Sequence, residues 1–339
     1  MTKNSLPKRN KIAFQGEHGA YSEIAAQKYF GIHAAMIPCP SFDEVFKAVA
    51  KGKALQGIVP LENSVAGTIH RIYDLLARHS LVLDGEIFLR ISHNLLANSA
   101  HAGGAKRIRQ IRRVYSHPQA LDQCEEFLKR HPWIEVISFR DTAGAAREVA
   151  LRRRQDEAAI ASRVAASLYG LSVVADHIET DRENYTRFGA IIKPAKKPIS
   201  AITAHPKSSR FRMHNFSADA TKQLERLNPR KIGIPSHRVE AGEYLLSAVK
   251  GNKVSLLLTL PHVAGSLSRF LVQCAGRGMN LTKVESRPLL GKPWEYLFYV
   301  DFEHTFSPEA LTRALSALRH EAVTLTVLGT YERGAAYEL

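Results

Sequence analysis

A polar stretch before an apolar run is the strongest candidate for chemistry. Thr186 and Arg187 lie within Asp181–Gly189 and directly precede Ala190-Ile191-Ile192. A threonine hydroxyl and a fixed guanidinium charge at the mouth of a strand suit a small anionic ligand. The alternative is an ordinary loop that leads into an edge strand.

Similar polar clusters follow other expected strands. Glu62-Asn63-Ser64 follows strand 56–59, Ser116-His117-Pro118-Gln119 follows strand 112–115, and Asp141-Thr142 follows strand 134–139. His93 falls inside a longer expected strand, 86–97, where it is either a hydrogen-bonded core residue or a catalyst. Clusters at successive strand ends are typical of ligand sites in parallel sheets.

The remaining pattern alternates strands with helices, which predicts an α/β fold with a parallel sheet covered on both faces. A glycine loop, Gly16–Ser22, follows strand 12–14 and lacks the spacing of a nucleotide loop. Ser41 is the expected N-cap of one helix and 120–130 the span of another. We expect two lobes like those of periplasmic binding proteins: 10–84 with 171–192, and 85–170.

The overall composition limits the possible classes of protein. A chain of 339 residues predicts two or three domains, and no apolar run reaches the roughly 18 residues of a membrane helix. The basic N-terminus leads into a strand-like run, so we expect a cytoplasmic protein. Cys39, Cys124 and Cys274 are too scattered for a disulfide framework or a metal site, and we expect no metal and no cofactor.

The C-terminal part has a different character. Residues 193–253 hold 13 Lys and Arg against 4 Asp and Glu, out of a net charge of +15. We therefore interpret 193–252 as a basic linker. Residues 253–335 show the order βαββαβ of a ferredoxin-like domain.

Six short sequence motifs, taken in their order along the chain, make this sequence resemble prephenate dehydratase with its amino-acid-sensing ACT domain. The catalytic domain, residues 10–192, carries Gly16-x-x-Gly19-x-Tyr21-Ser22, Pro60–Ser64, Tyr115–Gln119 and Asn184–Phe188. The C-terminal domain, 253–335, carries Gly265-Ser266-Leu267 and Glu285-Ser286-Arg287-Pro288. The resemblance covers most of the chain.

The resemblance implies decarboxylative dehydration of prephenate to phenylpyruvate, with Thr186 the residue most closely tied to turnover. Substrate-binding positions carried over in the same way are Asn63, His93, Ser116, Gln123, Thr142 (or its neighbour Asp141) and Arg187. A hydroxyl is a poor general acid, so we expect Thr186 to stabilise the leaving oxygen by a hydrogen bond; His93 as the acid is the competing assignment. Strand alternation places Arg187 opposite Thr186, so it contacts either a substrate carboxylate or the scaffold.

The resemblance also implies phenylalanine as an allosteric effector and a homodimer or homotetramer. Gly265, Ser266 and Leu267 would bind the effector together with Glu285, Ser286 and Arg287. The usual Gly-Ala-Leu-Val word reads Gly265-Ser266-Leu267-Ser268 here, which leaves the effector's identity open.

Three other functions remain to be weighed. The chain could be an arogenate dehydratase, because arogenate differs from prephenate by an amine in place of a keto group. The two-lobed domain could be an anion sensor without turnover. Finally, the basic runs 106–113 and 152–154 could bind nucleic acid, although no reading motif or aromatic platform accompanies them and solvated faces are the better interpretation.

Overall fold

The computed structural model describes residues 10–98, 105–194, 251–289, 292 and 294–338. These residues divide into two compact units: 10–75 with 84–193 and 334–338, and 76–83 with 194 and 251–333. Most of the predicted basic linker, residues 195–250, lies outside the described residues. Among the helices that the structure describes, none is both long and apolar enough to cross a membrane.

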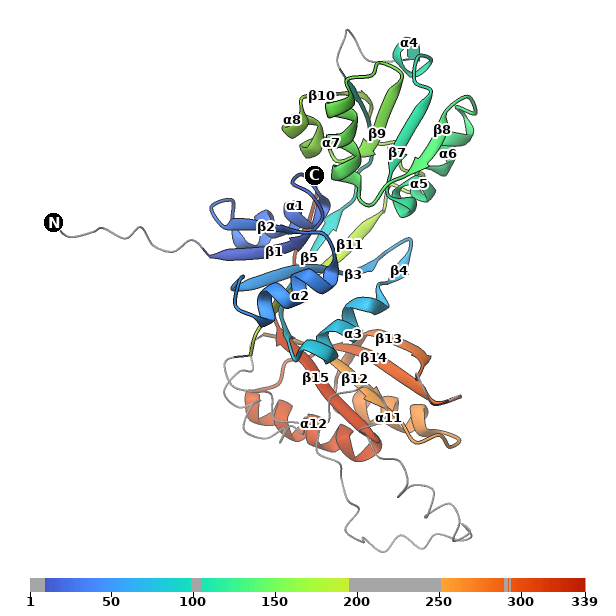
Figure 1. The fold of residues 1–339 in the computed structure, drawn as a ribbon. Helices are drawn as coiled ribbons and strands as arrows, with labels where there is room; N and C mark the ends of the chain where they lie inside the picture. Colours follow the sequence, from blue (N-terminus) through green and yellow to red (C-terminus); the bar gives the residue numbers. More distant parts are fainter. Residues whose placement is uncertain (1–9, 99–104, 195–250, 290–291, 293, 339) are drawn as a thin grey trace, which may run out of the picture. The chain divides into compact units, whose positions relative to one another are not determined.

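The first unit contains two sheets, each the centre of one lobe (Figure 1). In the first lobe the order is β5-β11-β3-β1-β2, where β1 (Lys11–Gln15) pairs in parallel with β2 (Ala35–Cys39) and β3 (Gln56–Asn63). The returning strand β11 (Tyr185–Ile192) pairs antiparallel with β3. Helices α1 (Tyr21–Phe30), α2 (Phe42–Ala50) and α3 (His70–His79) belong to this part of the chain.

The second lobe has the order β10-β6-β9-β7-β8. Its strands are β6 (Asn94–Asn98), β7 (Arg113–Ser116), β8 (Glu135–Ser138), β9 (Glu157–Ala161) and β10 (Leu171–Ala175). Its helices are α4 (Ala105–Ile108), α5 (Pro118–Gln123), α6 (Glu125–Lys129), α7 (Thr142–Arg152) and α8 (Arg163–Tyr169). The two-lobed α/β architecture expected from the sequence is confirmed.

Several local predictions were wrong. Strand 86–97 is two strands, β5 (Val82–Arg90) and β6, because the chain crosses between the sheets at 91–93. There the Ile91 N–H donates to the Asn184 carbonyl and the His93 N–H to the Glu179 carboxylate, in place of ladder bonds. Strand β10 pairs with β6, so residues 171–175 belong to the second lobe and not to the first.

Two other segments also differ. We expected strand 56–59 to stop before Pro60, yet β3 continues to Asn63 and turns into β4 (Gly67–Thr68). Pro60 is tolerated because it lies opposite Phe188 at a bulge in β3, where the pairing with β11 skips Leu61 and the ladder is already interrupted. The helix expected at 120–130 begins at Pro118 and breaks at Cys124, giving α5 and α6.

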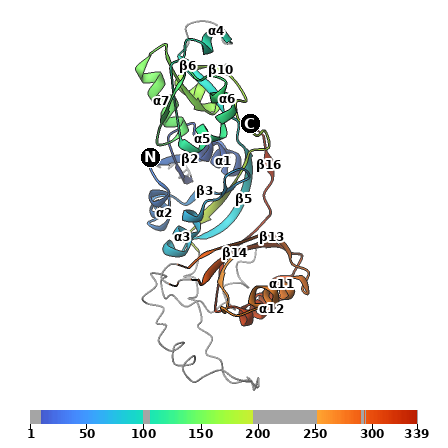
Figure 2. The same cartoon turned by 90° about the vertical axis from the view of Figure 1, so that its right-hand side faces the viewer.

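The second unit is an antiparallel sheet covered by two helices. Strands β12 (Lys253–Thr259), β13 (Asn280–Pro288), β14 (Tyr296–Glu303) and β15 (Thr324–Tyr331) have the order β13-β14-β12-β15. Helices α11 (Ser266–Ala275) and α12 (Pro308–Glu321) lie together on one side of the sheet (Figure 2). This order and connectivity confirm the ferredoxin-like prediction. A last short strand, β16 (Ala336–Tyr337), pairs with β5 in the first unit.

Candidate active site

Strands β3 and β11 bring Asn63 and Thr186 together, although 122 residues separate them in the sequence. The two residues are opposite each other in the antiparallel register. Side chains alternate along a strand, so Thr186 and Phe188 face the same side, and both line a cleft in the first unit. Arg187 faces the other side.

The orientation of the Asn63 amide is fixed by the backbone. Its Oδ1 accepts from the N–H groups of Val65, at 3.1 Å, and Ala66, at 2.9 Å. Its Nδ2 therefore faces β11, where it donates to Thr186 Oγ1 at 3.0 Å and to Asn184 Oδ1 at 2.7 Å. Because the Thr186 oxygen is an acceptor in this bond, its own proton remains available for another partner.

A chain of hydrogen bonds continues from Asn63 through Gln123 to His93. Gln123 Nε2 donates to Asn63 Oδ1 at 3.2 Å, and Gln123 Oε1 lies 2.8 Å from His93 Nε2. On its other side, His93 Nδ1 lies 3.2 Å from the hydroxyl of Tyr21. Burial lowers the pKa of His93, partly opposed by the Gln123 hydrogen bond and by the charge of Glu179. Residues from both lobes thus form one polar network.

The cleft has a volume of about 350 Å³, within the usual range of small-molecule sites. The first residues of three helices contribute to its wall: Tyr21 and Ser22 of α1, Gln119 and Ala120 of α5, and Thr142 of α7. Helix N-termini present free backbone N–H groups and a positive dipole end, which favour anions. Among the described lining residues there is no lysine or arginine. An anion here would meet backbone N–H groups, hydroxyl and amide donors, and the imidazoles of His93 and His117.

The glycine loop, Gly16–Ser22, joins the two lobes beside the cleft. Ser162 Oγ donates to the Gly19 carbonyl at 2.8 Å, and the Tyr169 hydroxyl donates to the His18 carbonyl at 2.7 Å. Gly19 has φ +88°, and a Cβ there would lie 3.0 Å from Ala165 Cα. Only glycine satisfies both requirements, which gives this motif a structural role that the sequence did not reveal.

The predicted substrate-binding residues fall into two groups. Asn63, His93, Gln123, Thr142 and Thr186 all line the cleft, and so does Asp141, whose carboxylate caps α7 by accepting from Gly144 N at 2.7 Å.

Ser116 and Arg187 lie away from the cleft wall. Ser116 is fully buried and its Oγ donates to the Ile160 carbonyl at 2.6 Å. Arg187 Nε donates to Glu86 Oε2 at 2.6 Å, and its NH1 lies 3.9 Å from Glu62. Of the two interpretations left open for Arg187, this geometry favours the scaffold.

Sequence reasoning did not assign Tyr21, His117 or Glu179 to the site. Tyr21 and His117 line the cleft, and the Glu179 carboxylate accepts from the His93 backbone at 2.8 Å. Tyr21 and His117 stand inside two of the motif words quoted above, which was the available signal. No sequence signal pointed to Glu179, because its contact with His93 depends on where the chain crosses back between the lobes.

The second unit contains a separate pocket of about 340 Å³. Ser266 and Leu267 line it, next to Gly265, which is the left-handed N-cap of α11 and has φ +79°. Tyr296 and Phe298 of β14 add aromatic rings. Glu285, Ser286 and Arg287 lie on the neighbouring strand β13, outside the lining residues of this pocket.

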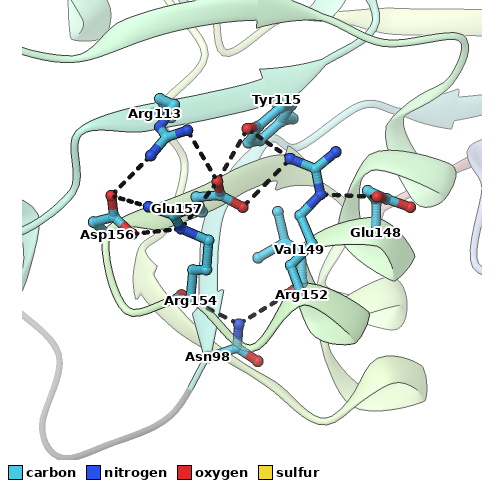
Figure 3. A network of polar contacts seen from close by, with 9 residues as sticks. All are labelled: Asn98, Arg113, Tyr115, Glu148, Val149, Arg152, Arg154, Asp156 and Glu157. Carbon is cyan, nitrogen blue, oxygen red and sulfur yellow. Dashed lines mark hydrogen bonds and ion pairs between the residues drawn. The ribbon is translucent and has the colours of Figure 1, made fainter.

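The basic run 152–154 is largely engaged in ion pairs (Figure 3). Glu157 is buried, and its carboxylate has Arg113, Arg152 and Arg154 at 3.4, 3.7 and 3.5 Å. The Tyr115 hydroxyl donates to it at 3.2 Å. Guanidinium groups turned inward toward carboxylates are poorly placed to neutralise phosphates, which weighs against a nucleic-acid surface here.

Glu157→Gln should destabilise the second lobe. The change keeps the shape but removes a carboxylate shared by three guanidinium groups, each of which keeps a second partner in Asp156 or Glu148, so we expect the free energy of unfolding to fall by roughly 2 kcal/mol. Urea unfolding followed by tryptophan fluorescence would measure the difference. Glu148→Gln is the matched control, since Glu148 pairs with Arg152 alone at 2.8 Å and at the surface, and should cost less than about 1 kcal/mol. Equal effects of the two changes would contradict the central role of Glu157.

Comparison with known proteins shows the family of this chain. The family model for prephenate dehydratase matches residues 12–196. An Arabidopsis thaliana protein named arogenate dehydratase/prephenate dehydratase 2, chloroplastic, is 37% identical over 332 residues, covering 95% of this chain and 73% of its own. The bifunctional chorismate mutase/prephenate dehydratase of Escherichia coli K12 is 30% identical, covering 96% and 71%. The chain therefore belongs to the prephenate dehydratase family, a family of lyases.

Solved structures add to this likeness. The solved structure of GqqA, described as a novel type of quorum quenching acylase, is 27% identical to this chain, with a TM-score of 0.69. The match covers 95% of this chain and 98% of the GqqA chain. Prephenate dehydratase from Arthrobacter aurescens in complex with L-Phe is 24% identical, with a TM-score of 0.70 and coverage of 95% and 90%. At this identity the second comparison speaks for the fold alone.

Proposed function

We propose that this chain converts prephenate to phenylpyruvate. The observation that carries the proposal is the Asn63–Thr186 hydrogen bond, which makes the Thr186 oxygen an acceptor and leaves its proton for a ligand in the cleft. A donor aimed at a departing oxygen stabilises the charge that develops there.

The reaction breaks two bonds of the substrate ring. The ring carboxylate leaves as CO2, its bonding electron pair moves into the ring, and the opposite C–O bond breaks so that the hydroxyl leaves with its electron pair as hydroxide, which takes a proton from solvent to become water. Aromatisation drives the step. The protein must orient the dianion, support the leaving oxygen and exclude bulk water. Thr186 would serve the leaving oxygen, and the N-terminus of α1, which has no side-chain cap, would hold a carboxylate.

The direct test is incubation with prephenate while the ultraviolet absorbance of phenylpyruvate is followed. Turnover supports the enzyme, whereas binding without turnover would identify an anion sensor. Arogenate is the competing substrate, and a competition assay with both compounds decides between them by the ratio of the two kcat/KM values.

We place the activity in the cytoplasm, because Cys39, Cys124 and Cys274 are all free thiols, which a reducing compartment favours.

We further propose that the second unit is an ACT domain that binds phenylalanine. The pocket beside Gly265 offers the uncapped N-terminus of α11 to a carboxylate and the rings of Tyr296 and Phe298 to an aromatic side chain. Glu285, Ser286 and Arg287 on β13 would then contribute from a neighbouring subunit of a homodimer or homotetramer. Light scattering with and without phenylalanine would give the oligomer size.

Gly265→Ala should weaken the response to phenylalanine by about tenfold while kcat stays near its original value. A side chain at φ +79° is strained, so the backbone at the start of α11 should relax, while the flexible end of Arg269, 3.2 Å from the added Cβ, can move aside. Inhibition curves at fixed prephenate measure the change. Gly278→Ala is the control, because Gly278 has φ +72° with open space around it and does not line the pocket. An unchanged response in Gly265→Ala would place the effector elsewhere.

A further inference from the structure

Each ring nitrogen of His93 faces an oxygen atom of the protein. At Nε2 the partner is Gln123 Oε1, 2.8 Å away. The Gln123 amide cannot be reversed without placing its oxygen against Asn63 Oδ1, which already accepts from two backbone N–H groups. His93 must therefore carry a proton on Nε2.

At Nδ1 the partner is the Tyr21 hydroxyl, 3.2 Å away. That hydroxyl lies 2.5 Å from the Ser92 carbonyl, to which it donates its single proton. Burial raises the pKa of Tyr21, so the group remains a hydroxyl at neutral pH. Tyr21 thus offers Nδ1 a lone pair, which is satisfied only by a second N–H. Neutral imidazole has one N–H, and the imidazolium ion has the two that this site accommodates.

Burial opposes that charge while no anion occupies the cleft. His93 is 2% exposed, and desolvation lowers its pKa below the usual value. The groups around it are Tyr21 from α1, the Glu179 carboxylate on its backbone N–H, and His177, which contacts Ser92 at 2.9 Å. His117 and Asp141 line the same cleft. A negative charge added nearby can therefore shift His93 from its neutral to its charged form.

The substrate of the proposed function brings two negative charges. Since the described lining residues include no lysine or arginine, histidine is their only source of a side-chain cation. A nearby anion favours the charged form of a titratable base. Binding should then raise the pKa of His93 above its value in the ligand-free protein.

We propose that His93 takes up a proton as the dianionic substrate enters the cleft, and that Tyr21 is the positioning residue that accepts its second N–H. This inference rests on the proposed function. Both N–H groups of the imidazolium are directed at protein oxygens, so His93 supplies a positive charge and donates no proton to the substrate. Thr186 remains the donor to the leaving oxygen. Affinity for prephenate should accordingly fall by up to tenfold per pH unit between the pKa of the free state and that of the bound state, and level off below the former and above the latter.

The test counts protons during binding. Isothermal titration of prephenate into the Thr186→Val protein is repeated in buffers of different ionisation enthalpy between about pH 6 and 8.5, and the proton consumed by residual turnover is measured separately and subtracted. We expect an uptake that approaches one proton per site. His93→Gln should abolish it. Tyr21→Phe should reduce it and raise KM about tenfold in the otherwise unaltered enzyme with little change in kcat.

Tyr169→Phe is the matched control for Tyr21→Phe, because it removes a hydroxyl that bonds the His18 carbonyl outside the cleft; its uptake should equal that of the parent. Binding without proton uptake across the pH range would overturn the proposal. Uptake that is undiminished in His93→Gln would also overturn it, because the proton would then be taken up by His117 or Asp141. If the unaltered chain neither binds nor converts prephenate, the proposed function itself fails, and that result is separate from binding without proton uptake.

Discussion

Thr186→Val is expected to lower kcat for prephenate by about 10²–10³-fold, the usual effect of removing one preorganised donor to a developing negative charge. Valine has nearly the same shape as threonine, so β11 and its pairing with β3 should be preserved. The change removes only the hydroxyl whose oxygen accepts from Asn63 at 3.0 Å and whose proton is available to the cleft. Steady-state assays of phenylpyruvate formation, with circular dichroism as the check on folding, measure the effect.

Thr186→Ser provides the complementary variant. It restores a hydroxyl at the same position without the methyl group and should recover activity to within about tenfold of the original. A folded Thr186→Val protein with a kcat near the original would refute the role of the hydroxyl. His93 would then become the leading candidate for the acid, which a His93→Asn pH profile would examine.

Asn63→Asp is the second change for which we expect a large loss, again about 10²-fold or more in kcat. The introduced carboxylate can still accept from Val65 N and Ala66 N, so the turn is kept. It can no longer donate to Thr186, and instead accepts the Thr186 proton that the substrate requires. Its charge also repels a dianionic substrate, so KM should rise together with the fall in kcat.

Asn98→Asp makes the same chemical change outside the cleft. Asn98 Nδ2 donates to the Val149 carbonyl at 2.8 Å in the second lobe, so its loss should cost stability and leave kcat unchanged. If the two variants lost activity equally, general destabilisation would explain the effect and the reversed hydrogen bond would not. Recovery of Asn63→Asp activity at low pH, where the carboxyl group is protonated, would support the reversal.

Much of the fold could be predicted because it depends on local patterns. Ser41 caps α2 by accepting from Glu44 N, and Ser307 caps α12 in the same way. The order of strands and helices in 253–335 specified the ferredoxin-like unit. The predictions failed where partners distant in sequence replace local bonds. The chain leaves the first sheet at Ile91, whose N–H finds Asn184, and β10 joins the second sheet because β6 lies beside it.

The sequence by itself determined the types of residue available to the candidate site and, through the short motifs, predicted that Thr186 and Asn63 belong to it; both line the cleft. Tertiary structure decided what each group does. The register of β3 and β11 makes Thr186 an acceptor from Asn63 and turns Arg187 toward Glu86. The return of the chain from the second lobe places Glu179 on the His93 backbone. Direction of donation and state of protonation depend on which atoms lie within about 3 Å, and spacing along the chain cannot specify that when the partners are 30 to 123 residues apart.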